Sequence, residues 1–143
     1  AAAALLLASL AGAAVAATTP AKPAAISATD RLKIRQVITL QIKAFERNDE
    51  TRAFSYSTPE IRKYFGSSRT SMEMVRASYS VLYMNTSREF LEAAVIDGAV
   101  VQPLRIVTRD GEAVVALYTL ERQPDREWRI GGCELAPSTL QAT

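Results

Sequence analysis

The residues best suited to acid–base chemistry in this sequence are three phenols and one carboxylate. Tyr79 and Tyr83 stand one helical turn apart, and Tyr118 stands in the middle of a strand-like run. An isomerase that moves a proton beside a carbonyl pairs a carboxylate base with a phenol that stabilises the oxyanion. In the strand-like run before Asp97, every second side chain faces the same side, and Glu92 falls in the same set as Ile96. Glu92 is therefore the acid in a plausible inward position. The pattern permits a histidine-free isomerase or lyase that acts on a small apolar substrate, unless Glu92 faces solvent from its strand.

A second hypothesis uses the same residues as the walls of a binding pocket that has no catalytic base. Arg76 would hold an anionic headgroup, and Gln41 and Gln102 would offer neutral hydrogen bonds to a small apolar or anionic ligand. The alternative is that the aromatic side chains pack the core, that Gln41 bonds to backbone, and that Arg76 reaches into water. The pocket candidates are Gln41, Arg76, Tyr79, Tyr83, Gln102, Tyr118 and Trp128.

The composition excludes several other classes of site. The chain has no histidine, which excludes a Ser-His-Asp triad, a Cys-His pair and histidine metal ligands. Cys133 is the only cysteine, so an internal disulfide and a thiolate zinc cluster are excluded, and a small buried side chain is the simplest role for it. The formal net charge is +2 and the basic residues form no cluster, so the sequence does not indicate a nucleic-acid-binding surface. We expect no metal, no cofactor and no nucleic-acid partner.

The first residues have the composition of an export signal. Residues 1–17 are uncharged and apolar, and Ala14-Val15-Ala16 matches the small-x-small pattern of a signal-peptidase site. Alanine is too weakly apolar for this segment to serve as a transmembrane anchor. We predict a truncated secretory signal over 1–17, a flexible leader over 18–28, a single domain over 29–137 and a tail over 138–143. No stable membrane anchor would remain after cleavage.

The predicted domain opens with a long amphipathic helix. Thr29 or Asp30 can cap its first turn, and apolar residues then recur at three- and four-residue steps. Asn48 predicts its end, because asparagine tolerates the left-handed turn that closes many helices.

A short helical piece through Ala53, Phe54 and Tyr56 is predicted next, and two further helices follow it. Pro59, preceded by a threonine that can cap, opens one of them, and Gly66 ends it. Thr70-x-x-Glu73 is a possible capping box for the other, whose apolar stripe continues to Tyr83.

Strand-like runs occupy the second half of the domain. Arg88 to Ile96 alternates weakly and leads to Asp97-Gly98, a dipeptide typical of a tight hairpin. Val100 to Leu135 holds three runs of β-branched and aromatic residues separated by short turns. The sequence therefore predicts an α+β domain in which three or four N-terminal helices pack on a four-stranded antiparallel sheet. If the other face of this sheet is open, a structural homodimer through the sheet is a further alternative.

Ordered motifs run through the domain from about residue 30 to residue 136: Ile38-x-x-Gln41-Ile42-x-Ala44-Phe45, Tyr64-Phe65-Gly66, Met74-Val75-Arg76-x-x-Tyr79, Ala116-Leu117-Tyr118 and Trp128-Arg129-Ile130-x-Gly132-Cys133. Together they resemble the bacterial family of the domain of unknown function 4864. That family is similar in layout to the nuclear transport factor 2-like superfamily, in which a curved antiparallel sheet wraps around N-terminal helices and forms a cone with a pocket.

The resemblance implies a curved, cone-like layout and a pocket between the helices and the sheet. For an exported bacterial protein it also implies a periplasmic or secreted location. It carries over no catalytic residue, because fold does not determine function in so diverse a superfamily. The resulting hypothesis is a non-catalytic small-ligand-binding or assembly domain, with the isomerase or lyase and the structural homodimer as alternatives.

Overall fold

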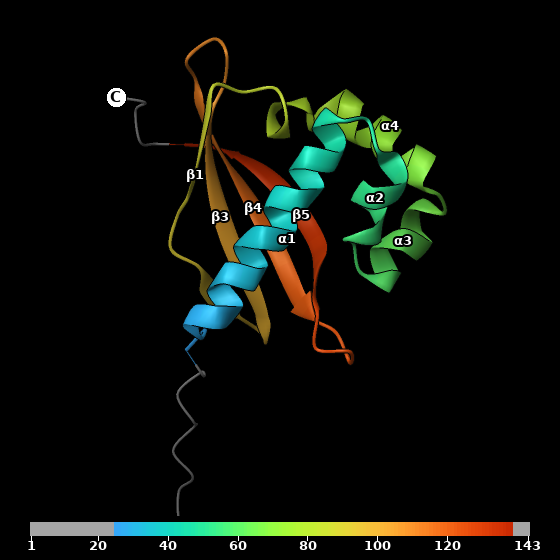
Figure 1. The fold of residues 1–143 in the computed structure, drawn as a ribbon. Coiled ribbons are helices and arrows are strands. Elements are labelled where there is room, and N and C mark those ends of the chain that lie inside the picture. The colour runs from blue at the N-terminus through green and yellow to red at the C-terminus, as the bar shows by residue number, and fades with distance from the viewer. Residues whose placement is uncertain (1–24, 139–143) are drawn as a thin grey trace, which may run out of the picture.

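The structure is a computed structural model that describes residues 25–138 (Figure 1). The predicted signal over 1–17, most of the leader and most of the tail lie outside the described residues. The helices come first along the chain: α1 (Ala28–Glu46), α2 (Glu50–Ser55), α3 (Pro59–Phe65), α4 (Ser68–Ser78) and a short 3-10 helix over Ser80–Leu82. Within 25–138, no helix is long and apolar enough to cross a membrane.

The strands follow the helices: β1 (Ser87–Phe90), β2 (Ala94–Ile96), β3 (Ala99–Val107), β4 (Ala113–Arg122) and β5 (Trp128–Pro137). They form one open antiparallel sheet in the order β1-β3-β4-β5, and β2 also pairs with β3. The α+β class, with helices followed by an antiparallel sheet, is confirmed. The predicted hairpin at Asp97-Gly98 is also present, and both of its residues have positive φ angles, 51° and 80°.

The prediction of four strands was wrong, because the run Arg88 to Ile96 is broken into two. The break begins at Leu91, which lies opposite Pro103 of β3 and donates its N–H to the Pro103 carbonyl at 3.0 Å. Proline has no N–H to return, so the ladder cannot continue there. The Leu91 carbonyl accepts a hydrogen bond from the Gln102 side chain instead, at 2.8 Å. A side chain of β3 thus replaces the missing backbone donor.

Helix α1 begins slightly earlier than predicted. Ser27, and neither Thr29 nor Asp30, is the capping residue, and its hydroxyl accepts a hydrogen bond from the Asp30 N–H at 3.0 Å. The predicted end of the helix is confirmed. Asn48 has a φ of 56°, and its backbone N–H donates to the Phe45 carbonyl at 3.0 Å, as in a Schellman turn.

Helices α3 and α4 have well-defined caps. Thr58 caps α3, Pro59 lies in its first turn and Gly66 ends it with a φ of 78°, as the sequence predicted. The capping box at Thr70 is not formed, because Ser67 caps α4 three residues earlier by accepting from the Thr70 N–H at 3.1 Å. Thr70 therefore lies inside the helix.

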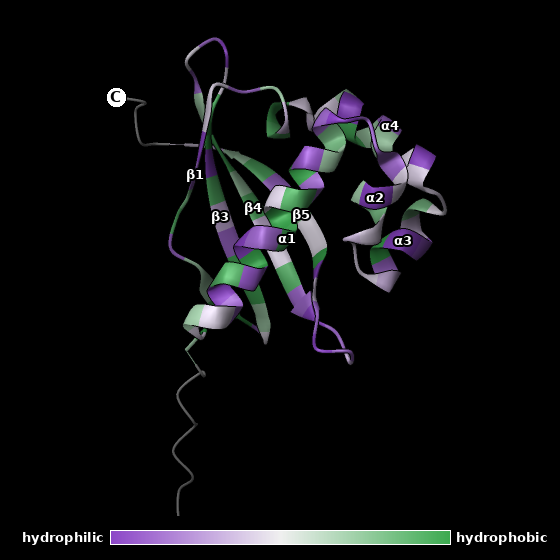
Figure 2. Cartoon of the chain, in the orientation of Figure 1, coloured by the Kyte–Doolittle hydropathy of each residue, from purple (hydrophilic) through white to green (hydrophobic). Residues whose placement is uncertain are grey.

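The core lies between α1 and one face of the sheet. Helix α1 crosses that face diagonally, whereas α2, α3 and α4 gather beyond the β5 edge (Figure 1). Hydrophilic residues gather in the turn between β4 and β5, while hydrophobic residues follow the strands (Figure 2). The fully or almost fully buried apolar side chains include residues of α1, α4 and the strands: Ile34, Ile38, Ile42, Met72, Leu104, Ile106, Ala116 and Leu120.

A short parallel bridge ties the helical group to the sheet. Ile130 of β5 donates its N–H to the Tyr56 carbonyl at 2.8 Å and accepts from the Thr58 N–H at 2.9 Å. These bonds fix the segment between α2 and α3 against β5. This attachment places α3 beside β5.

Asp30 connects the start of α1 to the start of β5. Its carboxylate accepts hydrogen bonds from Trp128 Nε1 at 3.1 Å and from the Ser27 hydroxyl at 2.9 Å, and lies 4.0 Å from the Arg122 guanidinium. The Trp128 bond, then the Ser27 bond and the Arg122 charge, lower the pKa of Asp30 below its ordinary value. The ionised form is therefore favoured by folding.

We expect Asp30→Asn to lower the free energy of unfolding near neutral pH by about 1 kcal/mol, a modest loss because the side chain is 22% exposed and solvent screens it. A carboxylate with a depressed folded-state pKa stabilises the protein above its unfolded-state pKa of about 3.9 and loses that contribution as pH falls through the folded-state value. The difference between wild type and Asp30→Asn should therefore shrink in acid. Urea unfolding at about pH 6 and below about pH 3 measures it, with Asp110→Asn at an exposed hairpin tip as the control. If the two proteins differed in free energy of unfolding by the same amount at both pH values, the ionised Asp30 carboxylate would not be the source of the difference.

Candidate functional site

A cavity of about 210 Å³ lies between helices α3 and α4 and the sheet, beside β5. One part of its wall comes from the helices and the segment before α3, and the rest comes from α1 and β5. The lining residues are Gln41, Phe45, Ser57, Ile61, Tyr64, Phe65, Ser71, Met74, Val75, Tyr79, Leu82, Ile130, Gly132 and Cys133. None of these residues carries a formal charge at neutral pH, and most are apolar.

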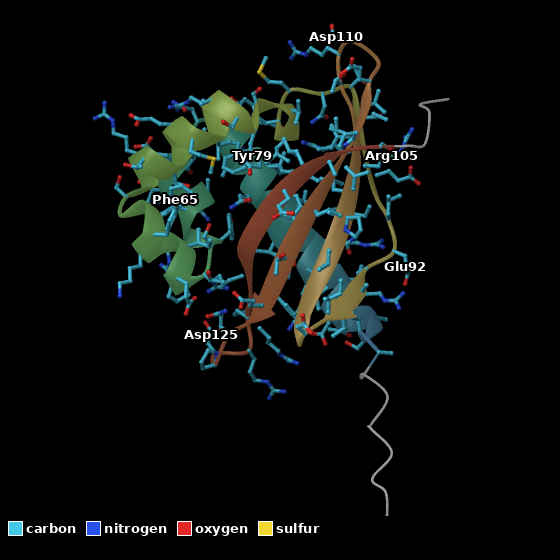
Figure 3. The ribbon with its side chains drawn as sticks, turned by 180° about the vertical axis from the view of Figure 1, so that it is seen from behind. Phe65, Tyr79, Glu92, Arg105, Asp110 and Asp125 are labelled. Carbon is cyan, nitrogen blue, oxygen red and sulfur yellow. The ribbon has the colours of Figure 1, made fainter. Side chains whose placement is uncertain are left out.

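Helix α3 forms the outer wall of this cavity. Its residues Ile61, Tyr64 and Phe65 line the cavity, yet none of the residues of α3 is buried. Tyr64 is 81% exposed and stacks edge-on against Phe65, with ring centroids 5.1 Å apart. Figure 3 shows Phe65 within the helical group and Tyr79 between that group and the sheet. The cavity is thus closed on one side by a helix that has little packing of its own.

Two polar side chains in the cavity wall are almost completely buried. Gln41 of α1 is 7% exposed, and its amide nitrogen donates to the Ala53 carbonyl at 3.3 Å. Ser57 is 5% exposed, and none of the hydrogen bonds found within residues 25–138 uses its hydroxyl group. The Gln41 amide oxygen likewise accepts no hydrogen bond from a described residue. The cavity therefore offers hydrogen-bonding groups that the protein itself leaves unused.

Cys133 lines the same cavity from β5, opposite the buried Tyr118 of β4. Burial raises the pKa of the Cys133 thiol to about 12, with the charge of Glu134 adding to the effect and Tyr118 opposing it. Burial also raises the pKa of the Tyr118 phenol well above its ordinary value. Both groups are protonated at neutral pH, so Cys133 is a poor nucleophile, as the sequence suggested.

Two of the seven predicted pocket residues, Gln41 and Tyr79, line this cavity. Gln41 also makes the backbone hydrogen bond that was its alternative role. Arg76 lies on the exposed face of α4, where its guanidinium donates to the Asn48 side chain. Tyr83 packs against Phe45, with ring centroids 6.2 Å apart, and does not reach the cavity wall.

The remaining candidates lie elsewhere. Gln102 and Tyr118 are directly opposite each other on β3 and β4, fully buried in the core. The Gln102 amide oxygen and the Tyr118 hydroxyl have no hydrogen-bond partner among the described residues. Trp128 lines a separate hollow of about 170 Å³, together with charged residues that include Lys33 and Glu127.

Glu92 does not occupy the inward position that the enzyme hypothesis required. It lies in the break between β1 and β2, its side chain is 76% exposed, and it forms an ion pair with Arg31 at 3.4 Å. Ile96 of the same alternating set is exposed as well. Figure 3 shows Glu92 at the edge of the sheet away from Phe65 and Tyr79. The alternation does not continue through the break: Phe90 before it and Val95 after it both pack against the core, so the inward set shifts by one residue and Glu92 faces solvent.

Sequence reasoning missed most of the apolar wall. Ile61 and Phe65 were assigned only to a short helix, and Phe45 only to the apolar face of the first helix. The spacing of Ile61 and Phe65, one helical turn apart before Gly66, marks one face of α3. No local signal says that this face meets β5, because the bridge between Ser57 and Ile130 joins residues distant in sequence.

Within residues 25–138, no helix lies across the opposite face of the sheet (Figure 3). Its partly exposed apolar residues include Val101, Pro103, Val115 and Leu117 on β3 and β4, of which Pro103 and Leu117 are directly paired. The homodimer through the sheet stays a prediction.

The part of the chain that the structure describes contains no group of three or more cysteine, aspartate or glutamate side chains placed to hold a metal ion. In comparisons with known proteins, neither a curated protein nor a solved structure matches the chain. A family model does match it, over residues 27–143, and its description is Domain of unknown function (DUF4864). This match covers more than half of the sequence, including all of the helices and strands described above, so the chain belongs to the DUF4864 family.

Proposed function

We propose that this domain binds a small, neutral, mainly apolar ligand in the cavity between α3, α4 and β5. The observation that carries the proposal is a cavity of about 210 Å³ whose wall is apolar apart from a few uncharged polar groups. Small-molecule sites typically combine such apolar walls with a few placed polar groups. The predicted cone-like layout of the nuclear transport factor 2-like superfamily, with a pocket between helices and sheet, is part of the same proposal.

The composition of the wall favours binding over catalysis. General acid–base catalysis needs a titratable group within hydrogen-bond reach of the substrate and with a pKa near the working pH. No carboxylate lines the cavity, and the Cys133 thiol has a pKa of about 12. Glu92 is exposed on another side of the molecule. An isomerase or lyase in this cavity would therefore lack a base.

The residues of the wall also indicate which charge the ligand carries. Arg76 does not line the cavity and donates to the Asn48 side chain, so no lysine or arginine side chain lies in the wall. Burying an ionised group without a partner costs several kcal/mol. A neutral ligand is favoured over the anionic one that remained possible from the sequence.

Titration with the neutral fluorescent probe N-phenylnaphthylamine tests the proposal. We expect saturable binding of one probe molecule per chain in the micromolar range, because apolar burial in a cavity of this size supports affinities of that order. The same titration at high and low salt should give the same affinity, since no charge is involved. A non-saturating signal, or none, would exclude the proposed function.

A further inference from the structure

The two buried polar side chains in the cavity have spare hydrogen-bonding capacity. Gln41 uses one amide hydrogen on the Ala53 carbonyl, which leaves its oxygen free to accept. Ser57 uses its backbone N–H on the Phe54 carbonyl at 3.1 Å, and its hydroxyl has no partner among the described residues. One side chain thus offers an acceptor, and the other offers a hydroxyl that can donate.

Both residues are held by the same short helix. The carbonyls that fix them belong to Ala53 and Phe54, which are consecutive residues of α2. Gln41 comes from α1 and Ser57 from the segment that bridges to β5, so three parts of the fold converge here. The bond to Ala53 also orients the Gln41 amide, because it places the nitrogen toward α2 and leaves the oxygen as the unpaired atom.

A purely hydrocarbon ligand would leave these groups without water or partners. Covering a buried donor or acceptor without replacing its hydrogen bond costs about 1–3 kcal/mol. A carboxylate could accept from Ser57 but could not donate to Gln41, and it would enter a wall without a cation. A hydroxyl group both donates and accepts.

We propose that Gln41 and Ser57 form a subsite for a neutral hydroxyl group, so that the ligand is an apolar alcohol whose O–H donates to the Gln41 amide oxygen and accepts from the Ser57 hydroxyl. This inference rests on the proposed function, because it concerns the same cavity. Beyond that function, it specifies that the ligand is an alcohol and that its hydroxyl end contacts these two residues.

The test is displacement of N-phenylnaphthylamine by hexanol, hexane and hexanoate at neutral pH. For each variant, the probe affinity is measured first, and the ratio of the hexane to the hexanol dissociation constant is then compared with that of wild type. Because the ratio is compared between variants, differences in the hydration of the two ligands cancel. We expect Ser57→Ala to lower this ratio about five- to tenfold, as the loss of one hydrogen bond does, and hexanoate to bind more weakly than hexanol.

Ser57→Ala is the main variant because its side chain makes no bond within the described residues, so the fold should not depend on it. Gln41→Leu is the second, with its folding checked by urea unfolding because it loses the bond to Ala53. Ser55→Ala is the matched control: it removes an exposed hydroxyl of α2 that bonds to the Arg52 carbonyl and does not line the cavity. It should leave the ratio unchanged.

The possible outcomes separate the two proposals. If hexane and the probe bind wild type but Ser57→Ala leaves the ratio unchanged, the hydroxyl subsite is excluded while the apolar cavity stands. If hexanoate binds more tightly than hexanol, the neutral subsite is likewise excluded. If neither the probe nor any of the three ligands binds, the proposed function itself fails.

Discussion

Ser71→Trp is expected to weaken binding of N-phenylnaphthylamine at least about tenfold, the equivalent of about 1.4 kcal/mol. Ser71 is a partly buried residue of α4 that lines the cavity, and its replacement by an indole would fill space that the ligand needs. The substitution leaves the Ser67 cap of α4 in place, so the helix should still form. The measurement is a fluorescence titration of the probe, accompanied by urea unfolding of the variant.

Ala77→Trp is the matched control for this experiment. Ala77 lies on the exposed side of the same helix and does not line the cavity, so its variant carries the same new side chain in solvent. Its probe affinity should equal that of wild type. Retention of full affinity by a folded Ser71→Trp protein would show that the probe binds somewhere other than this cavity.

Ile38→Ala is expected to lower the free energy of unfolding by about 2–5 kcal/mol, which is a large part of the stability of a domain of this size. Ile38 is completely buried in the middle of α1, where that helix crosses the sheet. Removing its apolar atoms loses their burial and leaves a cavity that a packed core fills only in part. Urea unfolding at neutral pH measures the loss through the shift of the transition midpoint.

Leu32→Ala is the control within the same helix. Leu32 is exposed, so the same type of truncation should change the free energy of unfolding by less than about 0.5 kcal/mol. If both variants lost the same stability, α1 would not pack on the sheet through the Ile38 face.

The exposed helix α3 gives the cavity an unusual boundary. Thr58 fixes its beginning through the bond to Ile130, and Gly66 ends it in a left-handed conformation. Between these two points the helix lines the cavity without burying any residue. Among the helices that line the cavity, α3 is therefore the one that buries least.

Local signals in the sequence were sufficient for most of the secondary structure. Asn48 and Gly66 end their helices because both tolerate positive φ, and Asp97-Gly98 forms its hairpin for the same reason. Where two residues competed for the same role, local signals failed. Ser27 caps α1 in place of Thr29, and Ser67 caps α4 in place of Thr70. Each of these hydroxyl groups can accept the hydrogen bond from a first-turn backbone N–H, so the residue type alone does not say which one does.

The candidate site was predicted only in part, and the reason lies in contacts between distant residues. Gln41 lies on the inward face of α1 and lines the cavity. Tyr79 also lines it, but from the residue after α4, because that helix ends at Ser78 and does not continue to Tyr83 as predicted. Gln102 also faces inward, but the missing N–H of Pro103 turns its amide toward the Leu91 carbonyl in the core. Glu92 was assigned to the wrong face, because the strand that carries it breaks at the same proline.

The sequence by itself determined the class of this fold and the chemistry that is absent from it. The order of helical and strand periods required an α+β domain, and the lack of histidine excluded whole classes of catalytic site. Only the tertiary structure decided where the cavity lies. The bridge between Ser57 and Ile130 sets α3 against β5, and it thereby creates a cavity lined by residues up to 92 positions apart, Gln41 and Cys133. Such a contact depends on the packing of the whole chain, which no local pattern encodes.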